Sequence, residues 1–76
     1  MPHQPPTPEE LEAAPVISRW YAEDGALIGN VTGHPGIEEG HLVRTSPVLA
    51  IDEDAGWVRT RSRYYRLGVH GMEKLN

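Results

Sequence analysis

The chain has 76 residues, no cysteine, and 11 acidic against 7 basic residues, which gives a formal net charge of −4. A chain of this length supports one hydrophobic core, and the absence of cysteine excludes disulfides and thiolate metal sites as means of stabilising it. No apolar run approaches the ~20 residues that span a membrane, and the first residues lack the basic and apolar parts of a signal peptide. We therefore predict one soluble cytoplasmic domain, stabilised by tight packing or by formation of a homo-oligomer.

The start of the chain predicts a tail followed by a short helix. Residues 1–6 are rich in proline and polar side chains, which is typical of a disordered tail. Thr7 is a favourable N-cap, and Glu10 completes a capping box with it. Because Pro15 disfavours helical geometry in the residue before it, we expect the helix to occupy residues 7–14. Such a helix covers one end of a sheet, or else serves as a handle for a partner.

Residues 15–68 predict a β domain, since segments rich in β-branched and aromatic residues alternate with turn-forming residues. Gly29, within one such segment, predicts a bulge or a close approach of the backbone. Pro47 cannot donate a ladder hydrogen bond, so the strand that contains it must bend, bulge or run along an edge there, or else divide into two strands. The expected strand segments cover residues 16–21, 26–32, 41–51 and 57–67.

Four to five short strands with hairpin turns predict a mainly β fold, either a small antiparallel meander or an SH3-like barrel, with the short helix at its N-terminus. Residues 69–76 lack periodicity and are expected to form a C-terminal tail. The two-residue alternation of strands predicts which side chains face the core. These are Ile17 or Trp20, Leu27, Val31, Val43, Leu49, Ile51, Val58 and Leu67.

Motifs for catalysis or metal binding are absent from the sequence. The histidines His3, His34, His41 and His70 lack the spacing of a tetrahedral site, and whether His34 and His41 converge stays open. The acidic run at residues 52–54 lacks the glycine and the glutamate of a calcium loop. We predict a non-enzymatic protein without metal or cofactor, and a small hydrolase or metal-binding protein is the remotest alternative.

Positive charge is concentrated near the C-terminus. Residues 1–56 hold two arginines and ten acids, whereas residues 57–76 hold four arginines and one lysine against a single acid. Guanidinium groups bind carboxylates and phosphates in bidentate fashion, and aromatic rings supply stacking surfaces. A short Arg-Thr-Ser run at residues 44–46 repeats part of this pattern. The candidate binding residues are Arg44, Thr45, Ser46, Trp57, Arg59, Arg61, Arg63 and Tyr65.

Residues 57–67 form either one continuous strand or a hairpin with Arg61 and Ser62 at its tip. In one strand, three arginines would form a ladder on one face. We expect this segment to bind an acidic protein surface or, alternatively, a nucleotide-like anion. A third interpretation is an exposed sheet edge whose charges prevent aggregation. The acidic net charge argues against binding to duplex DNA.

Several short motifs of the sequence form a recognisable set: Gly33-His34-Pro35, Gly40, Thr45-Ser46-Pro47-Val48, Ile51-Asp52 and the run from Arg59 to Gly68. Together these motifs resemble short uncharacterised proteins of proteobacteria and their phages, of the domain-of-unknown-function type. The resemblance covers about half of the chain and implies no activity and no residue roles. It implies a context in which small acidic proteins inhibit host defence, by occupying a protein surface or by sequestering a nucleotide signal.

Overall fold

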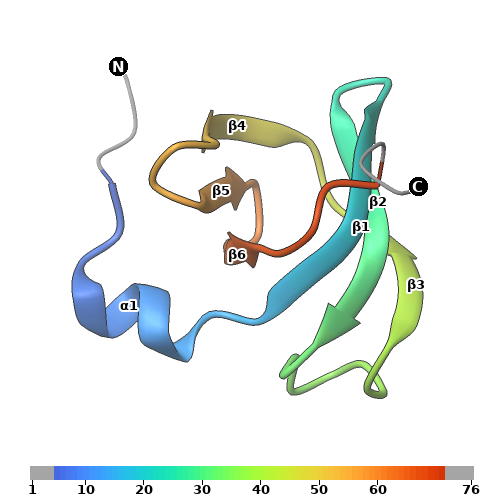
Figure 1. Cartoon of the computed structure of the whole chain (residues 1–76), viewed down its shortest axis with the longest axis horizontal. Helices are drawn as coiled ribbons and strands as arrows, with labels where there is room; N and C mark the ends of the chain where they lie inside the picture. Colours follow the sequence, from blue (N-terminus) through green and yellow to red (C-terminus); the bar gives the residue numbers. More distant parts are fainter. Residues whose placement is uncertain (1–4, 72–76) are drawn as a thin grey trace.

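The computed structural model describes residues 5–71 and has a mainly β fold with one short helix, as the sequence predicts (Figure 1). Most of the expected tail at residues 1–6, much of that at residues 69–76, and His3 lie outside the described residues. The elements are α1 (Pro8–Ala13), β1 (Val16–Glu23), β2 (Ala26–Thr32), β3 (His41–Arg44), β4 (Val48–Asp52), β5 (Trp57–Thr60) and β6 (Tyr64–Leu67).

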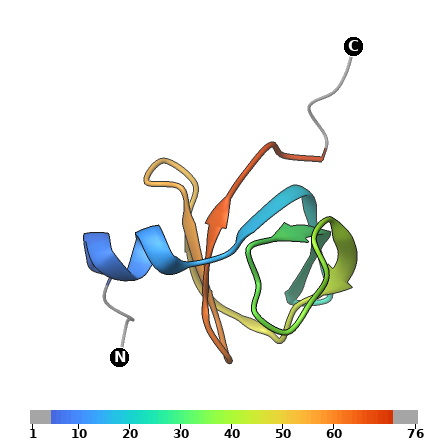
Figure 2. The same cartoon turned by 90° about the horizontal axis from the view of Figure 1, so that it is seen from below.

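The helix α1 begins at the predicted capping box. The N–H of Glu10 donates to Thr7 Oγ1 (3.1 Å), and the N–H of Thr7 donates back to Glu10 Oε1 (2.9 Å). Ala14 is extended, with φ −74° and ψ 144°, because Pro15 follows it. Arg66 fixes the end of the helix to β6 by donating from Nε to Ala14 O (3.1 Å). The helix therefore lies against the β6 side of the sheet, away from β2 and β3 (Figure 2).

The six strands form one sheet in the order β3-β2-β1-β6-β5-β4. Neighbouring strands are antiparallel, except that β1 and β6 are parallel. Figure 1 shows β1, β2 and β3 in one half of the molecule and β4, β5 and β6 in the other. The sheet is mixed and has six strands, where a purely antiparallel sheet of four to five strands was expected.

Two of the four expected strand segments divide, residues 41–51 and residues 57–67, which gives six strands. The expected strand at residues 41–51 bends around Pro47 and becomes β3 and β4, one at each edge of the sheet. The N–H of Thr45 donates to Leu27 O (2.8 Å), and the N–H of Val48 donates to Gly25 O (2.7 Å), so the bend is held against the β1–β2 hairpin. The sheet curls on itself, and the last strand returns to β1 in the same direction.

The core contains most of the residues predicted for it. Its buried cluster is Ile17, Trp20, Leu27, Val31, Val58 and Tyr65, with Val43, Val48 and Leu67 packed against it. Two predictions are wrong: Leu49 is 44% exposed and Ile51 is 41% exposed. Both lie on β4, which is an edge strand, so no second strand covers them.

The bulge predicted by Gly29 is present in the facing strand β1. The register of β1 shifts between Ser18 and Tyr21, and Arg19 within the bulge has φ 54°. A Cβ on Gly29 would lie 2.8 Å from both Ile17 Cγ1 and Ser18 O, so only glycine fits this approach.

The same bulge accepts residues 69–71 on the other side of β1. Trp20 and His70 form an isolated parallel bridge, and the N–H of Gly71 donates to Trp20 O (2.8 Å). The Trp20 indole donates from Nε1 to Gly68 O (3.2 Å). The segment after β6 is therefore held along β1 by backbone and side-chain contacts.

Candidate binding site

The basic segment at residues 57–67 is a hairpin, which confirms the second of the two alternatives. We call it the arginine hairpin; it consists of β5, the turn at residues 61–63 and β6. Arg59 lies opposite Tyr64 in the ladder. The three arginines therefore do not form one ladder: Arg59 lies on β5, Arg61 is exposed at the turn, and Arg63 precedes β6.

Thr60 holds the turn of the arginine hairpin in one conformation. Its side chain is fully buried (0% exposed), and Oγ1 donates to Arg63 O (3.0 Å). The N–H of Arg63 donates to the same Oγ1 (3.2 Å), and the N–H of Thr60 donates to Arg63 O (2.9 Å). The backbone that carries the arginines is thus fixed before any partner arrives, which lowers the entropic cost of binding.

The two Arg-Thr-Ser-like stretches of the sequence meet at one pair of serines. Ser46 Oγ and Ser62 Oγ are 2.7 Å apart, and the N–H of Ser62 donates to Ser46 Oγ (3.2 Å). The N–H of Arg61 donates to Pro47 O (2.9 Å) beside them. Two hydroxyl groups and the backbone of the exposed residue Arg61 are therefore grouped at the turn.

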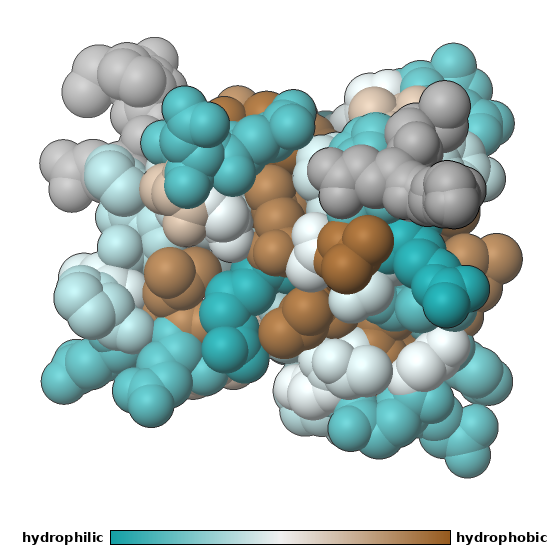
Figure 3. All heavy atoms as spheres, viewed as in Figure 1, coloured by the Kyte–Doolittle hydropathy of each residue, from teal (hydrophilic) through white to brown (hydrophobic). Residues whose placement is uncertain are grey.

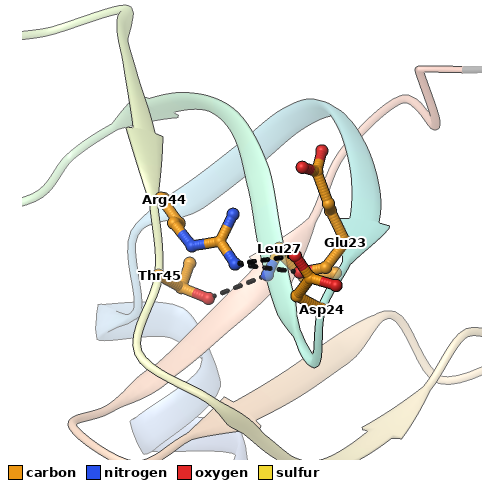
Figure 4. Close-up of polar contacts among 5 residues, drawn as sticks. All are labelled: Glu23, Asp24, Leu27, Arg44 and Thr45. Atoms are coloured by element: carbon orange, nitrogen blue, oxygen red, sulfur yellow. Dashed lines mark hydrogen bonds and ion pairs between the residues drawn. The ribbon is translucent and has the colours of Figure 1, made fainter.

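Arg44 and Thr45 directly precede Ser46 in the sequence, but their side chains contact the β1–β2 hairpin (Figure 4). Thr45 is buried, and its Oγ1 accepts from the N–H of Leu27 (3.0 Å). Arg44 donates from Nη2 to Glu23 O (3.3 Å) and lies 4.0 Å from Asp24 Oδ2. Of the three residues expected to join a binding surface from this run, only Ser46 lies at the arginine hairpin.

Trp57 and Tyr65, both expected as stacking surfaces, are buried (7% and 5% exposed). Burial raises the pKa of the Tyr65 phenol above its ordinary value, although the positive charge of Arg63 opposes the shift. The aromatic ring beside the arginines is that of Tyr64. Arg59 Cζ lies 4.9 Å from its centroid, and Trp57 meets it edge-on with centroids 6.0 Å apart. The register of the β5–β6 pair determines that Tyr64, and not Tyr65, lies beside Arg59. The sequence alone does not determine this register.

His34 is a second residue that sequence reasoning left out of the site. Its ring centroid lies 6.2 Å from that of Tyr65. Desolvation, followed by repulsion from the Arg63 guanidinium, lowers the pKa of His34 below its ordinary value. The only sequence signal for this contact is that His34 belongs to a turn with two glycines and a proline, which brings the ring back over the sheet.

Three arginines of the hairpin have no acidic partner among residues 5–71. The ion pairs in this part of the chain join His41 to Glu38 (3.5 Å) and Arg44 to Asp24. The charges of Arg59, Arg61 and Arg63 are therefore not neutralised within the fold. The pairing with acids on neighbouring strands that the edge-protection interpretation assumes is not observed there.

A shallow groove lies between α1 and the arginine hairpin, with a volume of about 270 Å³. Arg63 and Tyr64 form one wall, and Glu10, at the first turn of α1, belongs to the other. The groove is lined by Glu10, Ala13, Ala14, Pro15, Arg63 and Tyr64. It gives the basic surface a concave apolar margin.

Within residues 5–71, no three His, Cys, Asp or Glu side chains come together as a metal site requires. No helix in this range is long and apolar enough to cross a membrane.

The comparisons with known proteins give a family and no activity. Residues 3–75 match the model of a family of unknown function, DUF6634. No curated protein and no solved structure matches the chain. Because the match extends over nearly the whole sequence, the chain belongs to the DUF6634 family.

Proposed function

We propose that this protein is a small non-enzymatic binding protein that acts by occupying an acidic surface of a partner protein. The contact surface is formed by Arg59, Arg63 and Tyr64, and Arg61 extends it at the turn. The observation that carries the proposal is the absence of any acidic partner for these arginines among residues 5–71, in a chain whose net charge is −4.

Two further features support this proposal. The turn is fixed by Thr60, so the guanidinium groups start from a defined backbone. Arg59 stacks on Tyr64, and Arg63 and Tyr64 line the groove against α1. Arginine beside an aromatic ring is the composition typical of residues that dominate binding energy at interfaces.

The narrowest form of the proposal is inhibition of a host protein, such as a defence protein, by a phage-type or prophage protein in the cytoplasm. The resemblance to short phage proteins implies this context. Stoichiometric occupancy suits a chain of 76 residues with a small groove beside the arginine hairpin and no sequence motif for catalysis.

The test compares capture of partner proteins from a lysate of the source cells by three tagged chains. These are the wild type, the double variant Arg59→Ala/Arg63→Ala, and Arg44→Ala as the control, because Arg44 is exposed but paired with Asp24. We expect the amount of captured protein to fall by roughly tenfold or more in the double variant and to be unchanged in the control. Equal capture by the double variant, or no reproducible capture by the wild type, contradicts the proposal.

A nucleotide-like anion is the second candidate ligand. The observation that favours it is the grouping of the Ser46 and Ser62 hydroxyls with Arg61, since phosphate oxygens accept from hydroxyl, backbone and guanidinium donors. If the protein sequesters such a ligand, its melting temperature rises with ligand concentration. A panel of mono-, di- and cyclic nucleotides that leaves the melting temperature unchanged removes this candidate.

A further inference from the structure

The strand β4 forms one edge of the sheet and pairs only with β5. An edge strand presents unpaired backbone groups, and natural proteins protect such edges with charged residues, proline or a covering segment. The strand β4 has no charged residue before its last position. Its residues are Val48, Leu49, Ala50, Ile51 and Asp52.

The apolar side of β4 continues the hydrophobic core beyond the sheet edge. Ile51 lies opposite Val58, which is fully buried, yet Ile51 itself is 41% exposed. Leu49, two residues earlier, is 44% exposed. Figure 3 shows hydrophobic atoms at the margin of the molecule where β4 runs in Figure 1, with hydrophilic atoms beside them.

The opposite edge, β3, is protected in the ordinary way. His41 at its start lies 3.5 Å from Glu38, and Arg44 at its end lies near Asp24. Leu42 is 67% exposed but stands between these polar ends. Within the described part of the chain, the edge strand β4 has no ion pair along it. Its first residue is held to the β1–β2 turn, because the N–H of Val48 donates to Gly25 O (2.7 Å), but no further strand pairs with its outer side among residues 5–71.

We propose that a second copy of this chain covers β4. The two β4 strands run antiparallel about a twofold axis near Ala50, next to the register shift of β4 between Val48 and Ala50, and this brings Leu49 and Ile51 of one copy beside those of the second. The symmetry repeats this apolar pair on both sides of the axis. The two sheets become one continuous sheet, and the core face extends across the axis.

The charges at the two ends of β4 fit a second copy in this orientation. Asp52 ends the strand and Glu53 and Asp54 follow it, whereas Arg61 lies near its beginning, where its N–H donates to Pro47 O (2.9 Å). Antiparallel pairing brings the acidic turn of each copy beside the Arg61 turn of the other. None of these four charged side chains has an ion-pair partner among the described residues of one chain.

The antiparallel orientation follows from these charges and not only from symmetry. Parallel pairing of the two β4 strands would place acidic turn beside acidic turn, and like charges in that position are destabilising. The antiparallel dimer instead forms two equivalent sets of opposite charges. A chain this small and without disulfides also gains core volume by such an association.

The mass in solution tests the dimer, measured by sedimentation velocity across a dilution series. A dimer has twice the chain mass of 8.4 kDa. We expect the wild type to be a dimer at high concentration, and Ile51→Lys, which places a charge on the apolar edge, to be a monomer throughout. Leu42→Lys is the matched control on the other edge and should remain a dimer.

A wild type that stays monomeric at the highest concentration overturns the proposal, and so does an Ile51→Lys variant that associates as well as the wild type. Circular dichroism establishes that each variant is folded. Leu49→Lys provides a second variant at the same edge if Ile51→Lys does not fold.

A charge exchange tests the orientation. Arg61→Glu should raise the dissociation constant of the dimer by roughly tenfold at low salt, because the substitution occurs at two symmetry-related positions of the interface. Adding Asp54→Arg to that variant should restore the affinity. If Arg61→Glu leaves the dissociation constant unchanged, the antiparallel arrangement is wrong.

The dimer and the proposed function are tested separately. In the dimer Arg61 faces the acids of the second copy, and Arg59 and Arg63 remain for the partner protein. Ile51→Lys keeps both of these arginines, so its mass in solution tests the dimer without changing the residues proposed to bind the partner protein.

Discussion

Thr60 is a buried polar residue whose hydroxyl group satisfies both backbone groups of Arg63. Thr60→Val keeps the shape of the side chain but removes these hydrogen bonds. We expect the free energy of unfolding to fall by about 1–3 kcal/mol, because the part-buried N–H of Arg63 loses its partner and Arg63 O keeps only its bond from the N–H of Thr60. Thr32→Val, at the exposed end of β2, is the control and should change it by no more than about 0.5 kcal/mol. Equal effects in denaturant unfolding would show that Thr60 does not hold the turn.

His34 reports on the charge of the arginine hairpin. Desolvation and then Arg63 lower its pKa, so the folded state favours the neutral ring. Its contribution to stability is therefore present above the unfolded pKa of about 6.5 and is lost as the pH falls below that value.

The variant Arg63→Ala tests this coupling. Removal of the like charge should raise the pKa of His34 toward its ordinary value, measured by an NMR titration of the imidazole carbon-bound protons. Arg44→Ala, at a guanidinium group that interacts with Glu23 and Asp24 instead, should leave it unchanged. A His34 pKa that stays constant or falls in Arg63→Ala would mean that the two side chains are not close.

At the scale of elements, the bulge in β1 depends on Gly29 in β2. Gly29→Ala places a Cβ 2.8 Å from Ile17 Cγ1 and Ser18 O, which must move. We expect a loss of about 1–3 kcal/mol in the free energy of unfolding, as for other overpacked sites. Gly36→Ala is the control, because a Cβ on Gly36 would lie 3.5 Å from its nearest neighbour, an atom of the His34 ring. If thermal melts show equal stability for both variants, the close approach at Gly29 is not present.

Local signals in the sequence predicted several elements correctly. The capping box at Thr7, the glycine at residue 29 and the proline at residue 47 each act within a few residues or on one facing strand. Their consequences for helix, bulge and bend are therefore determined locally.

The sequence could not fix which strands lie at the edges. Leu49 and Ile51 alternate as core residues do, but their exposure depends on β4 having only one neighbour. The same limit applies to the site. A single-strand reading places Tyr65 with the arginines, whereas the turn at residues 61–63 puts Tyr64 beside Arg59 and Tyr65 in the core. Arg44 and Thr45 looked like a second part of the site because their partners across the sheet were unknown.

At the scale of the whole molecule, charge is segregated in sequence and in space. Acids outnumber bases overall, yet the arginine hairpin holds unpaired positive charge beside a groove. Such a surface attracts acidic partners, and its affinity falls as salt screens the interaction. Strand β4 supplies a separate apolar edge. Under our two proposals, the arginine hairpin is the surface for a partner protein and β4 is the surface for a second copy of the chain.

We propose that Arg59 and Arg63 provide the binding surface. The most direct measurement is the dissociation constant of the captured partner protein for the wild type, Arg59→Ala/Arg63→Ala and Arg44→Ala at the same ionic strength. We expect only the double variant to bind the partner more weakly, by roughly tenfold or more, while its circular dichroism spectrum remains that of the wild type. A folded double variant that binds as tightly as the wild type would contradict it.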